Sequence, residues 1–383
     1  MADTITLQSS GRRLSKFTPS ASMLMDRTIV VYGASGTGKT VIIKNLMNLL
    51  SDHIEQVLVI SPTEAQNRSY DGYVDSPLIH STMYLPPEGE TIPPAKRKKA
   101  DREEGAVRFL EAIFKRQEMA ATIFSRANNP EIIESLIKKL SPDIMAQCKF
   151  RLKQVENWRD RTIAMLQQLH AVEPEKFAQQ RDDVRKKGDR VINLIYKKIL
   201  TMARDYLMDH ARLNEDEKYT LHYLNFNPRM LLIFDDCADV LKKLSKNGIF
   251  DAIFYRGRHA MLTTIISCQD DTDMPASLRK NAFISFFTTS TVAVANFERA
   301  SNSFDKDTKT FISRSASEVF VGHRKLVYIR EDTERKNFYY VNFRIPPVIR
   351  FGSAALHELC DEVKNNEVSM DKKNPYFQMY KIP

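Results

Sequence analysis

The segment Gly33–Thr40 has the residue types and the spacing of a phosphate-binding loop. It reads GASGTGKT, fits the pattern G-x-x-x-x-G-K-[ST], and holds three of the chain's 12 glycines. Glycines let the backbone wrap closely around a triphosphate, so that successive N–H groups point at its oxygens. Lys39 would neutralise the β- and γ-phosphates, and the Thr40 hydroxyl would bind Mg²⁺. A glycine-rich turn without a ligand is the alternative, but it has no need of the Lys-Thr pair. The sequence therefore predicts an ATP–Mg²⁺ site whose nucleotide-binding residues are Gly33, Ala34, Ser35, Gly36, Thr37, Gly38, Lys39 and Thr40.

A pair of carboxylates supplies the second half of such a site. The apolar run LLIF ends in Asp235 and Asp236, and ligands of open α/β sheets bind at the carboxyl ends of the strands. Asp235 is predicted to hold Mg²⁺ through water, and Asp236 to polarise the attacking water. The alternative is that the pair caps the next helix.

Gln269 is predicted to sense the γ-phosphate. It follows the apolar run of the next expected strand, in the segment SCQD. An amide at that place can hydrogen-bond both the γ-phosphate and the attacking water. The alternative is a strand-end glutamine that caps a turn together with Asp270.

A cluster of cations precedes this strand in the segment FYRGRHAM. Arg258 is predicted to be an arginine finger that reaches into a neighbouring subunit and stabilises the charge on the transferred phosphoryl group. Arg256 and Arg279 are the competing candidates. The alternative is that Arg256, Arg258 and His259 complement a helix dipole.

Apolar runs alternate with helical patterns, which predicts an α/β fold with a mainly parallel sheet. The helix that follows the glycine loop is expected over Thr40–Leu50, and a further helix near Gly248–Arg256. Two more strands are expected in KLVYIRE and NFYYVNFRI, with a helical stretch before them in VAVANFERASNSF. The five strands expected around the site are Arg27–Tyr32, Gln56–Thr63, Arg229–Asp236, Met261–Asp270 and Ala282–Thr289.

The domain organisation predicted from these patterns is a core interrupted by an insertion. Residues 1–94 form the first part of the core, 95–226 a basic helical insertion, 227–350 the second part, and 351–383 a C-terminal tail. The proline-containing segment Leu85–Gly105 is expected to be a linker, and Val107–His222 shows helical periodicity without a strand. The basic helices are a candidate contact for nucleic acid or for another subunit, or else an ordinary solvated face.

Composition narrows the class of protein further. The chain has 383 residues and a net charge of +9, which fits a polyanionic partner such as nucleic acid. Its four cysteines never form C-x-x-C, so neither a disulfide framework nor a zinc site is expected. No signal peptide and no run of about 18 apolar residues occurs, so an intracellular protein without a membrane span is predicted.

Taken together, these segments resemble the DNA-packaging ATPases of large nucleocytoplasmic DNA viruses, the poxvirus-type branch of the FtsK/HerA superfamily. The resemblance rests on GASGTGKT, on ISPTEAQNRSY with Asn67, on LLIFDDCAD, on FYRGRH before SCQ, and on PASLRKN. It covers about Thr28–Asn67 and Met230–Thr289, and the long helical insertion departs from it.

The resemblance implies a RecA-like P-loop NTPase sheet of the additional-strand type and a homo-oligomeric ring. It also implies ATP-driven translocation of double-stranded DNA into a preformed capsid, with a capsid or portal-vertex protein as partner. The protein would then act in the host cytoplasm at the viral assembly site, or in the virion. Two other classes stay open: a cellular or plasmid DNA-pumping ATPase, and a nucleotide-switch module with little hydrolysis.

Overall fold

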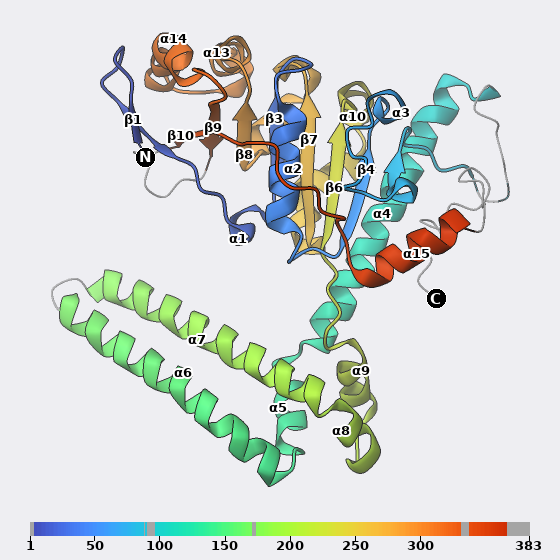
Figure 1. Cartoon of the computed structure of the whole chain (residues 1–383), viewed down its shortest axis with the longest axis vertical. Helices are drawn as coiled ribbons and strands as arrows, with labels where there is room; N and C mark the ends of the chain where they lie inside the picture. The colour runs from blue at the N-terminus through green and yellow to red at the C-terminus, as the bar shows by residue number, and fades with distance from the viewer. Residues whose placement is uncertain (1–3, 88, 90–95, 171–173, 331–336, 366–383) are drawn as a thin grey trace. The chain divides into compact units, whose positions relative to one another are not determined.

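The computed structural model describes residues 4–87, 89, 96–170, 174–330 and 337–365 of the chain (Figure 1). These residues form two compact units. The sheet unit comprises Met1–Ala121 and Pro228–Pro383, and the helical unit comprises Thr122–Asn227.

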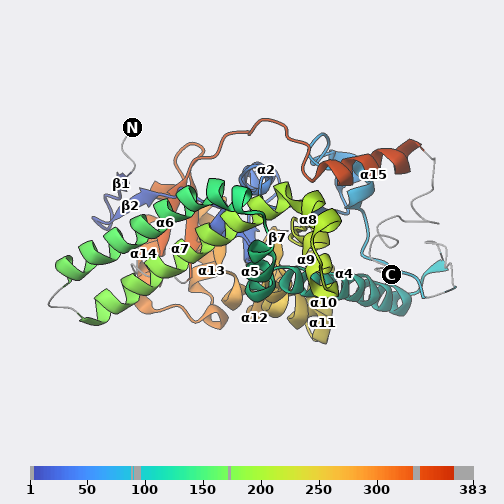
Figure 2. The ribbon, with the colours of Figure 1, turned by 90° about the horizontal axis from the view of Figure 1, so that it is seen from below.

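The sheet unit is built on one ten-stranded sheet whose central strands are parallel. The strands run in the order β1-β2-β10-β9-β8-β3-β7-β6-β4-β5. All five pairs between β8 and β5 are parallel. Helices cover both faces: Figure 2 shows α2 on one side of the sheet and α10, α11 and α12 on the other. The parallel strands are β3 (Thr28–Tyr32), β4 (Gln56–Ile60), β5 (Ile79–His80), β6 (Met230–Asp235), β7 (Leu262–Cys268) and β8 (Ile284–Phe287).

The predicted α/β fold with a mainly parallel sheet and a helical insertion is therefore confirmed. Each of the five strands expected around the site forms, because each is a mostly apolar run that the flanking helices bury on both faces. The strand that precedes Gln269, β7, lies between the loop strand β3 and the aspartate strand β6. This is the additional strand that the resemblance implies.

The other edge of the sheet is largely antiparallel. It contains β1 (Thr4–Thr6), β2 (Arg13–Lys16), β9 (Lys325–Ile329) and β10 (Phe338–Val341). Strands β9 and β10 lie in the two segments expected from the sequence, whereas β1 and β2 were not expected. The N-terminal segment is short and mostly polar, so its strands depend on pairing with each other and with β10.

Nine helices lie wholly within the described part of the sheet unit, and short turns join several of them. The helix expected over Gly248–Arg256 is α11 followed by a π-helical turn, Ala252–Arg256, and a 3₁₀ turn, Gly257–Ala260. The flanking helices are α1 (Ala21–Leu24), α2 (Lys39–Leu50), α3 (Glu64–Asn67), α10 (Ala238–Leu244), α11 (Gly248–Asp251), α12 (Ala276–Asn281), α13 (Ser290–Glu298), α14 (Lys306–Val319) and α15 (Ala354–Asn365).

Helix α4 (Lys99–Ala127) belongs mainly to the sheet unit. Its apolar residues Phe109, Leu110 and Ile113 are buried in the same core as the strands. The sequence places the start of the insertion at residue 95, whereas the helical unit begins at Thr122. The expected linker Leu85–Gly105 is helical from Lys99 onward, and its residues 88 and 90–95 lie outside the described part.

The helical unit contains α5 (Pro130–Lys138), α6 (Pro142–Leu169), α7 (Pro174–Met202), α8 (Arg204–His210) and α9 (Glu215–Tyr223). Its described residues contain no strand, as the periodicity predicts. Helices α6 and α7 lie side by side as a long hairpin (Figure 1), and Arg159 of α6 packs against Gly188 of α7. A separate apolar cluster, which includes Leu136 and Leu200, holds the base of this unit together.

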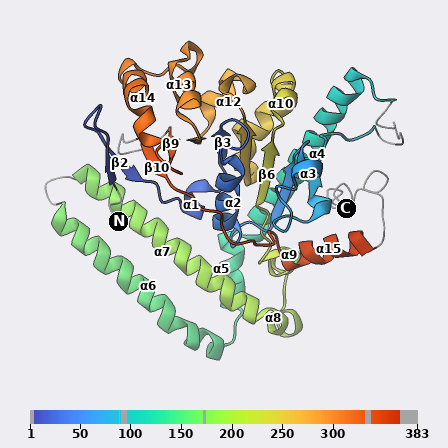
Figure 3. The ribbon, with the colours of Figure 1, turned by 45° about the horizontal axis from the view of Figure 1, so that its top comes forward.

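Residues 342–353, which we call the strap, connect β10 to α15 and cross the P-loop helix α2 (Figure 3). The side-chain amide of Asn45 donates to the carbonyl of Arg344 at 2.7 Å, and the Tyr73 hydroxyl donates to the carbonyl of Pro346 at 2.9 Å. Phe351 is fully buried. The sequence predicts a tail from residue 351, but helix α15 continues to Asn365, and residues 366–383 lie outside the described part.

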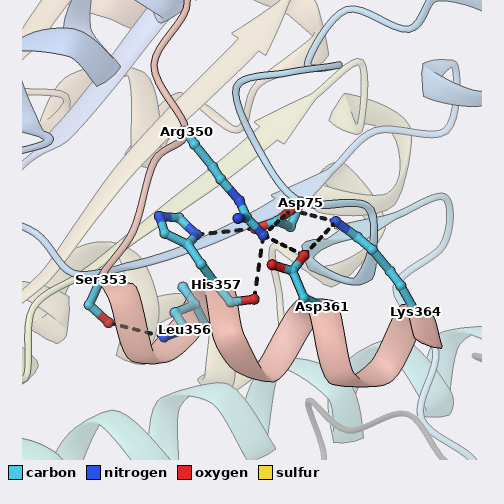
Figure 4. A network of polar contacts seen from close by, with 7 residues as sticks. All are labelled: Asp75, Arg350, Ser353, Leu356, His357, Asp361 and Lys364. Atoms are coloured by element: carbon cyan, nitrogen blue, oxygen red, sulfur yellow. Dashed lines mark hydrogen bonds and ion pairs between the residues drawn. The ribbon is translucent and has the colours of Figure 1, made fainter. Parts of the chain in front are cut away.

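One buried carboxylate, Asp75, anchors α15 to the sheet unit (Figure 4). Its side chain is 6% exposed, and Arg350, His357 and Lys364 all contact it. Arg350 donates to both oxygens, at 2.9 and 3.0 Å, and Lys364 donates at 2.6 Å. Burial by itself raises the pKa of Asp75, but the three partners outweigh burial and hold that pKa below the ordinary value of 3.8.

We predict that Asp75→Asn lowers the free energy of unfolding by about 2–4 kcal/mol at neutral pH, because it leaves cations without their buried partner. Asp361→Asn is the matched control, since Asp361 also contacts Arg350 and Lys364 but is 49% exposed. Its substitution should lower the free energy of unfolding by less. Because the folded-state pKa of Asp75 is lowered, its contribution is present at neutral pH and is lost as the pH falls below 3.8. Urea unfolding at a series of pH values measures this, and equal losses in the two variants would contradict the prediction.

Candidate nucleotide-binding site

The glycine loop lies between the carboxyl end of β3 and the start of α2. Gly36 and Gly38 have φ angles of 75° and 98°, a left-handed region that residues with a Cβ rarely adopt. Gly33 is required for a different reason. A Cβ at this position would lie 1.7 Å from the hydroxyl oxygen of Thr288, at the end of β8. The loop is therefore packed tightly against the neighbouring strand.

The loop has the backbone donors that a phosphate needs. Among the described residues, no acceptor pairs with the backbone N–H groups of Ser35, Gly36, Gly38, Lys39 or Thr40. Helix α2 has 12 residues and begins at Lys39, so its dipole adds positive potential at the same place. Free N–H groups around a helix start fit an anionic group such as phosphate.

Lys39 folds over the loop and faces the aspartate pair. Its ammonium group donates to the carbonyl of Gly33 at 2.8 Å and lies 4.0 Å from a carboxylate oxygen of Asp236. The residue is 8% exposed. A phosphate that enters the loop would meet this cation between the backbone donors and the carboxylates.

Asp235 is the last residue of β6, and Tyr70 holds it in place. The Tyr70 hydroxyl donates to a carboxylate oxygen of Asp235 at 3.0 Å, and the tyrosine is fully buried. Burial raises the pKa of Asp235, while the hydrogen bond from Tyr70 acts in the opposite direction. Glu64 fixes the tyrosine in turn, since its carboxylate accepts the backbone N–H groups of Ser69 and Tyr70 at 2.9 and 2.7 Å.

Asp236 follows directly in a left-handed conformation, with φ of 55°, which is uncommon for a residue other than glycine. Its oxygen Oδ1 is buried and has no hydrogen-bond partner among the residues that the structure describes. A buried, unpaired carboxylate oxygen beside a lysine fits a water molecule or a hydrated Mg²⁺ ion. In the described chain no group of three His, Cys, Asp or Glu side chains could hold a metal.

Gln269 directly follows the carboxyl end of β7, and the loop and the aspartate pair lie at the carboxyl ends of the neighbouring strands. Its side chain is exposed and makes no hydrogen bond to any residue that the structure describes. The register that pairs Tyr32 with Cys268 makes Gln269 level with Gly33. The amide is therefore free to contact a bound phosphate.

The three candidate arginines differ sharply in their surroundings. Arg258 is exposed and lies before β7, at the opposite end of that strand from Gln269. Seven residues of strand span about 23 Å, so Arg258 does not reach the loop of its own chain. The guanidinium of Arg256 lies over the ring of Phe114.

Arg279 is occupied within its own chain. Its guanidinium donates to the carbonyls of Asp271 and Met274 and to the side chains of Ser301 and Asn302. These four bonds tie α12 to its neighbouring turns. They leave Arg279 a poorer candidate for a finger than Arg258.

Sequence reasoning missed three residues of this site: Tyr70, Thr288 and Lys325. Tyr70 stands after α3, at the end of the segment ISPTEAQNRSY, and the place of that segment in the resemblance is the only signal in the sequence. Thr288 contacts Thr37 through the two hydroxyl oxygens, 2.6 Å apart. Lys325 donates to the carbonyl of Thr288 at 3.1 Å. No local pattern marks either residue, because strand pairing brings them to the loop.

Comparison with solved structures gives only low similarity. The genome-packaging NTPase B204 of Sulfolobus turreted icosahedral virus 2 is 12% identical, covers 85% of this chain and 98% of its own, and has a TM-score of 0.33. The plasmid coupling protein TrwB is 13% identical over 88% of this chain and 92% of its own, with a TM-score of 0.34. At these values neither similarity carries an argument about function. No helix of the described chain is long and apolar enough to cross a membrane.

Comparison of sequences is far more informative. No protein-family model matches the chain. Protein 075L of invertebrate iridescent virus 6 is 35% identical over 65 residues, which is 17% of this chain and 25% of that protein. The uncharacterized protein B354L of African swine fever virus is 41% identical over 376 residues, which is 97% of this chain and 98% of B354L. At that identity and coverage, the chain belongs to the B354L protein family of African swine fever virus.

Proposed function

We propose that this protein is an ATPase that translocates double-stranded DNA and packages a viral genome into a preformed capsid. One observation carries the proposal: three adjacent parallel strands, β3, β7 and β6, end in the glycine loop, Gln269 and the aspartate pair. The proposed phosphate donors, sensor amide and metal-binding carboxylate thus lie together at the carboxyl ends of these three strands. Full-length similarity to a protein of a large DNA virus supports the viral setting.

The roles of the residues follow from their positions. The loop N–H groups and Lys39 bind the phosphates, while Thr40 and, through water, Asp235 would hold Mg²⁺, which would neutralise charge on those phosphates. Asp236 orients and deprotonates the attacking water, since its buried oxygen has no other partner. Gln269 contacts both the γ-phosphate and that water. Hydrolysis therefore removes a contact of the residue that directly follows β7.

Double-stranded DNA fits the charge of the chain. The chain carries a net charge of +9, and its helical unit has 19 Lys and Arg against 15 Asp and Glu. Contacts of such groups with phosphate are independent of base sequence and weaken with salt. We place the protein in the host cytoplasm at the assembly site or in the virion, with a capsid or portal-vertex protein as partner.

A nucleotide switch with little hydrolysis is the second candidate function, because it would need the same loop. The steady-state rate of ATP hydrolysis, measured with and without long double-stranded DNA, separates the two. The translocase requires turnover that DNA stimulates. A cellular or plasmid DNA pump would behave alike in that assay, and the viral relatives argue against it.

We predict that Asp236→Asn lowers the hydrolysis rate by about 10²–10⁴-fold and leaves ATP binding within a few-fold of wild type. The amide retains the shape of the side chain but cannot accept the proton of water, whereas Asp235 still binds Mg²⁺. Asp239→Asn, an exposed carboxylate three residues later, is the matched control. Wild-type turnover in purified Asp236→Asn would remove this role.

Tyr70→Phe is predicted to raise the Mg²⁺ concentration needed for half-maximal hydrolysis by about fivefold, the value of one net hydrogen bond. The ring still fills the core, but Asp235 loses a donor that orients it and lowers its pKa, so the acid limb of the pH–rate profile moves to higher pH. Tyr73→Phe removes the hydroxyl that donates to the strap and controls for loss of a buried tyrosine hydroxyl. Identical Mg²⁺ curves in the two variants would refute the positioning role of Tyr70.

The position of Arg258 supports the proposed homo-oligomeric ring. Arg258 is exposed and lies at the amino end of β7, away from the loop of its own chain. An arginine in that position suits a finger that acts on the next subunit. An arginine finger contributes on the order of 10³-fold or more in turnover. Activity should therefore rise faster than linearly with protein concentration through the assembly range.

Mixing two inactive variants tests this arrangement. Arg258→Ala subunits should bind ATP normally and hydrolyse it poorly, and Lys39→Ala subunits should fail to hydrolyse it. In a mixed ring, some junctions pair an intact loop with an intact arginine, so hydrolysis should recover. Arg256→Ala, whose guanidinium already stacks on Phe114, is the control and should retain activity. Mixed rings that form but stay inactive would rule Arg258 out as the finger.

A further inference from the structure

Lys325, the first residue of β9, lies against the glycine loop. Its Cε atom is 3.8 Å from the position that a Cβ of Gly38 would occupy, and its ammonium group donates to the carbonyl of Thr288 at 3.1 Å. A second lysine thus borders the loop, on a strand far along the chain from the GASGTGKT motif.

Strand pairing explains why this lysine is there. Strand β9 is antiparallel to β8, with Leu326 opposite Phe287, so Lys325 is level with Thr288, the residue that follows β8. Thr288 in turn contacts Thr37 of the loop, with their hydroxyl oxygens 2.6 Å apart. The position of Lys325 is therefore fixed by the sheet and not by a mobile loop.

The ammonium group of Lys325 has no carboxylate partner. It forms no ion pair with any described residue, and one carbonyl is its only acceptor there. Partial burial lowers its pKa. Lys39 differs, because it has two loop carbonyls and lies near Asp236. A half-buried cation without a counter-ion is costly unless an anion joins it.

The order of the strands indicates which part of a nucleotide this cation meets. The aspartate pair and Gln269 end β6 and β7, on one side of the loop strand β3, whereas β8 and β9 lie on the other side. Mg²⁺ and the γ-phosphate belong with the aspartates. The remainder of a nucleotide bound in this way would leave the loop on the side of β8 and β9, where Gly38 and Lys325 lie.

We propose that Lys325 is a second lysine of the nucleotide site and binds the α-phosphate. This inference rests on the proposed ATPase function. A contact with the α-phosphate is the same in ATP and ADP, so Lys325 strengthens the binding of both nucleotides and does not report hydrolysis. That division of labour leaves Lys39 and Gln269 to distinguish the two states.

The test measures the affinity of the full-length chain for ADP and for a non-hydrolysable ATP analogue, with Mg²⁺, by calorimetry. Lys325→Gln should weaken both by about tenfold, as expected for one charge-assisted contact, and Lys325→Arg should restore most of the loss. Lys280→Gln, an exposed lysine of α12, is the control and should bind as wild type does. The thermal unfolding temperature without nucleotide should be alike in all variants.

Two results overturn the inference while the proposed function stands: unchanged affinity in Lys325→Gln, or a loss confined to the ATP analogue, which would move the contact to the γ-phosphate. Failure of the wild-type chain to bind either nucleotide overturns the proposed function itself. If Lys325→Gln does not fold, chemical labelling of the wild-type chain tests the inference instead. ADP should protect Lys325 from an amine-acylating reagent, as read by peptide mass spectrometry, and equal labelling with and without ADP also overturns the inference.

Discussion

The parallel pairing of β3, β7 and β6 is the interaction on which the candidate site depends. In parallel strands every carboxyl end points to the same edge, and the register pairs Tyr32 with Cys268 and Ser267 with Asp235. The backbone N–H of Gly33 continues this ladder to the carbonyl of Cys268 at 3.1 Å. The loop, Gln269 and the aspartate pair are thus level with one another, and a slip of one residue in either pair would separate them.

The neighbouring strands then set the charge around the loop. On one side, Tyr70 and the core of the sheet hold Asp235 where burial raises its pKa, so its negative charge is favourable only when a cation is close. On the other side, β8 and β9 bring Thr288 and Lys325 against the loop. Under the proposed function, a nucleotide with Mg²⁺ would supply the opposite charge on both sides, which would account for the polar groups there that have no partner among the described residues.

The strap and α15 tie this edge to the far end of the chain. The strap accepts hydrogen bonds from Asn45 and Asn48 of the P-loop helix and from Tyr73, between α3 and β5. Asp75, two residues after Tyr73, is the buried anchor for α15. A movement of α2 would therefore be transmitted to α15 through the contacts of the strap. This path does not run through the core of the sheet.

Local patterns determined much of this protein. The sequence predicts the glycine loop, the Asp235–Asp236 pair, Gln269 and the five central strands, because glycine spacing and mostly apolar runs act over a few residues. Only the tertiary structure decided that Tyr70 holds Asp235, 165 residues away, and that Lys325 borders the loop. It also decided that Arg258 lies at the opposite edge and that the helical unit begins at Thr122. Each of these facts depends on strands or helices that are remote in sequence packing together, and no short-range pattern of residue types encodes which distant partner will be met.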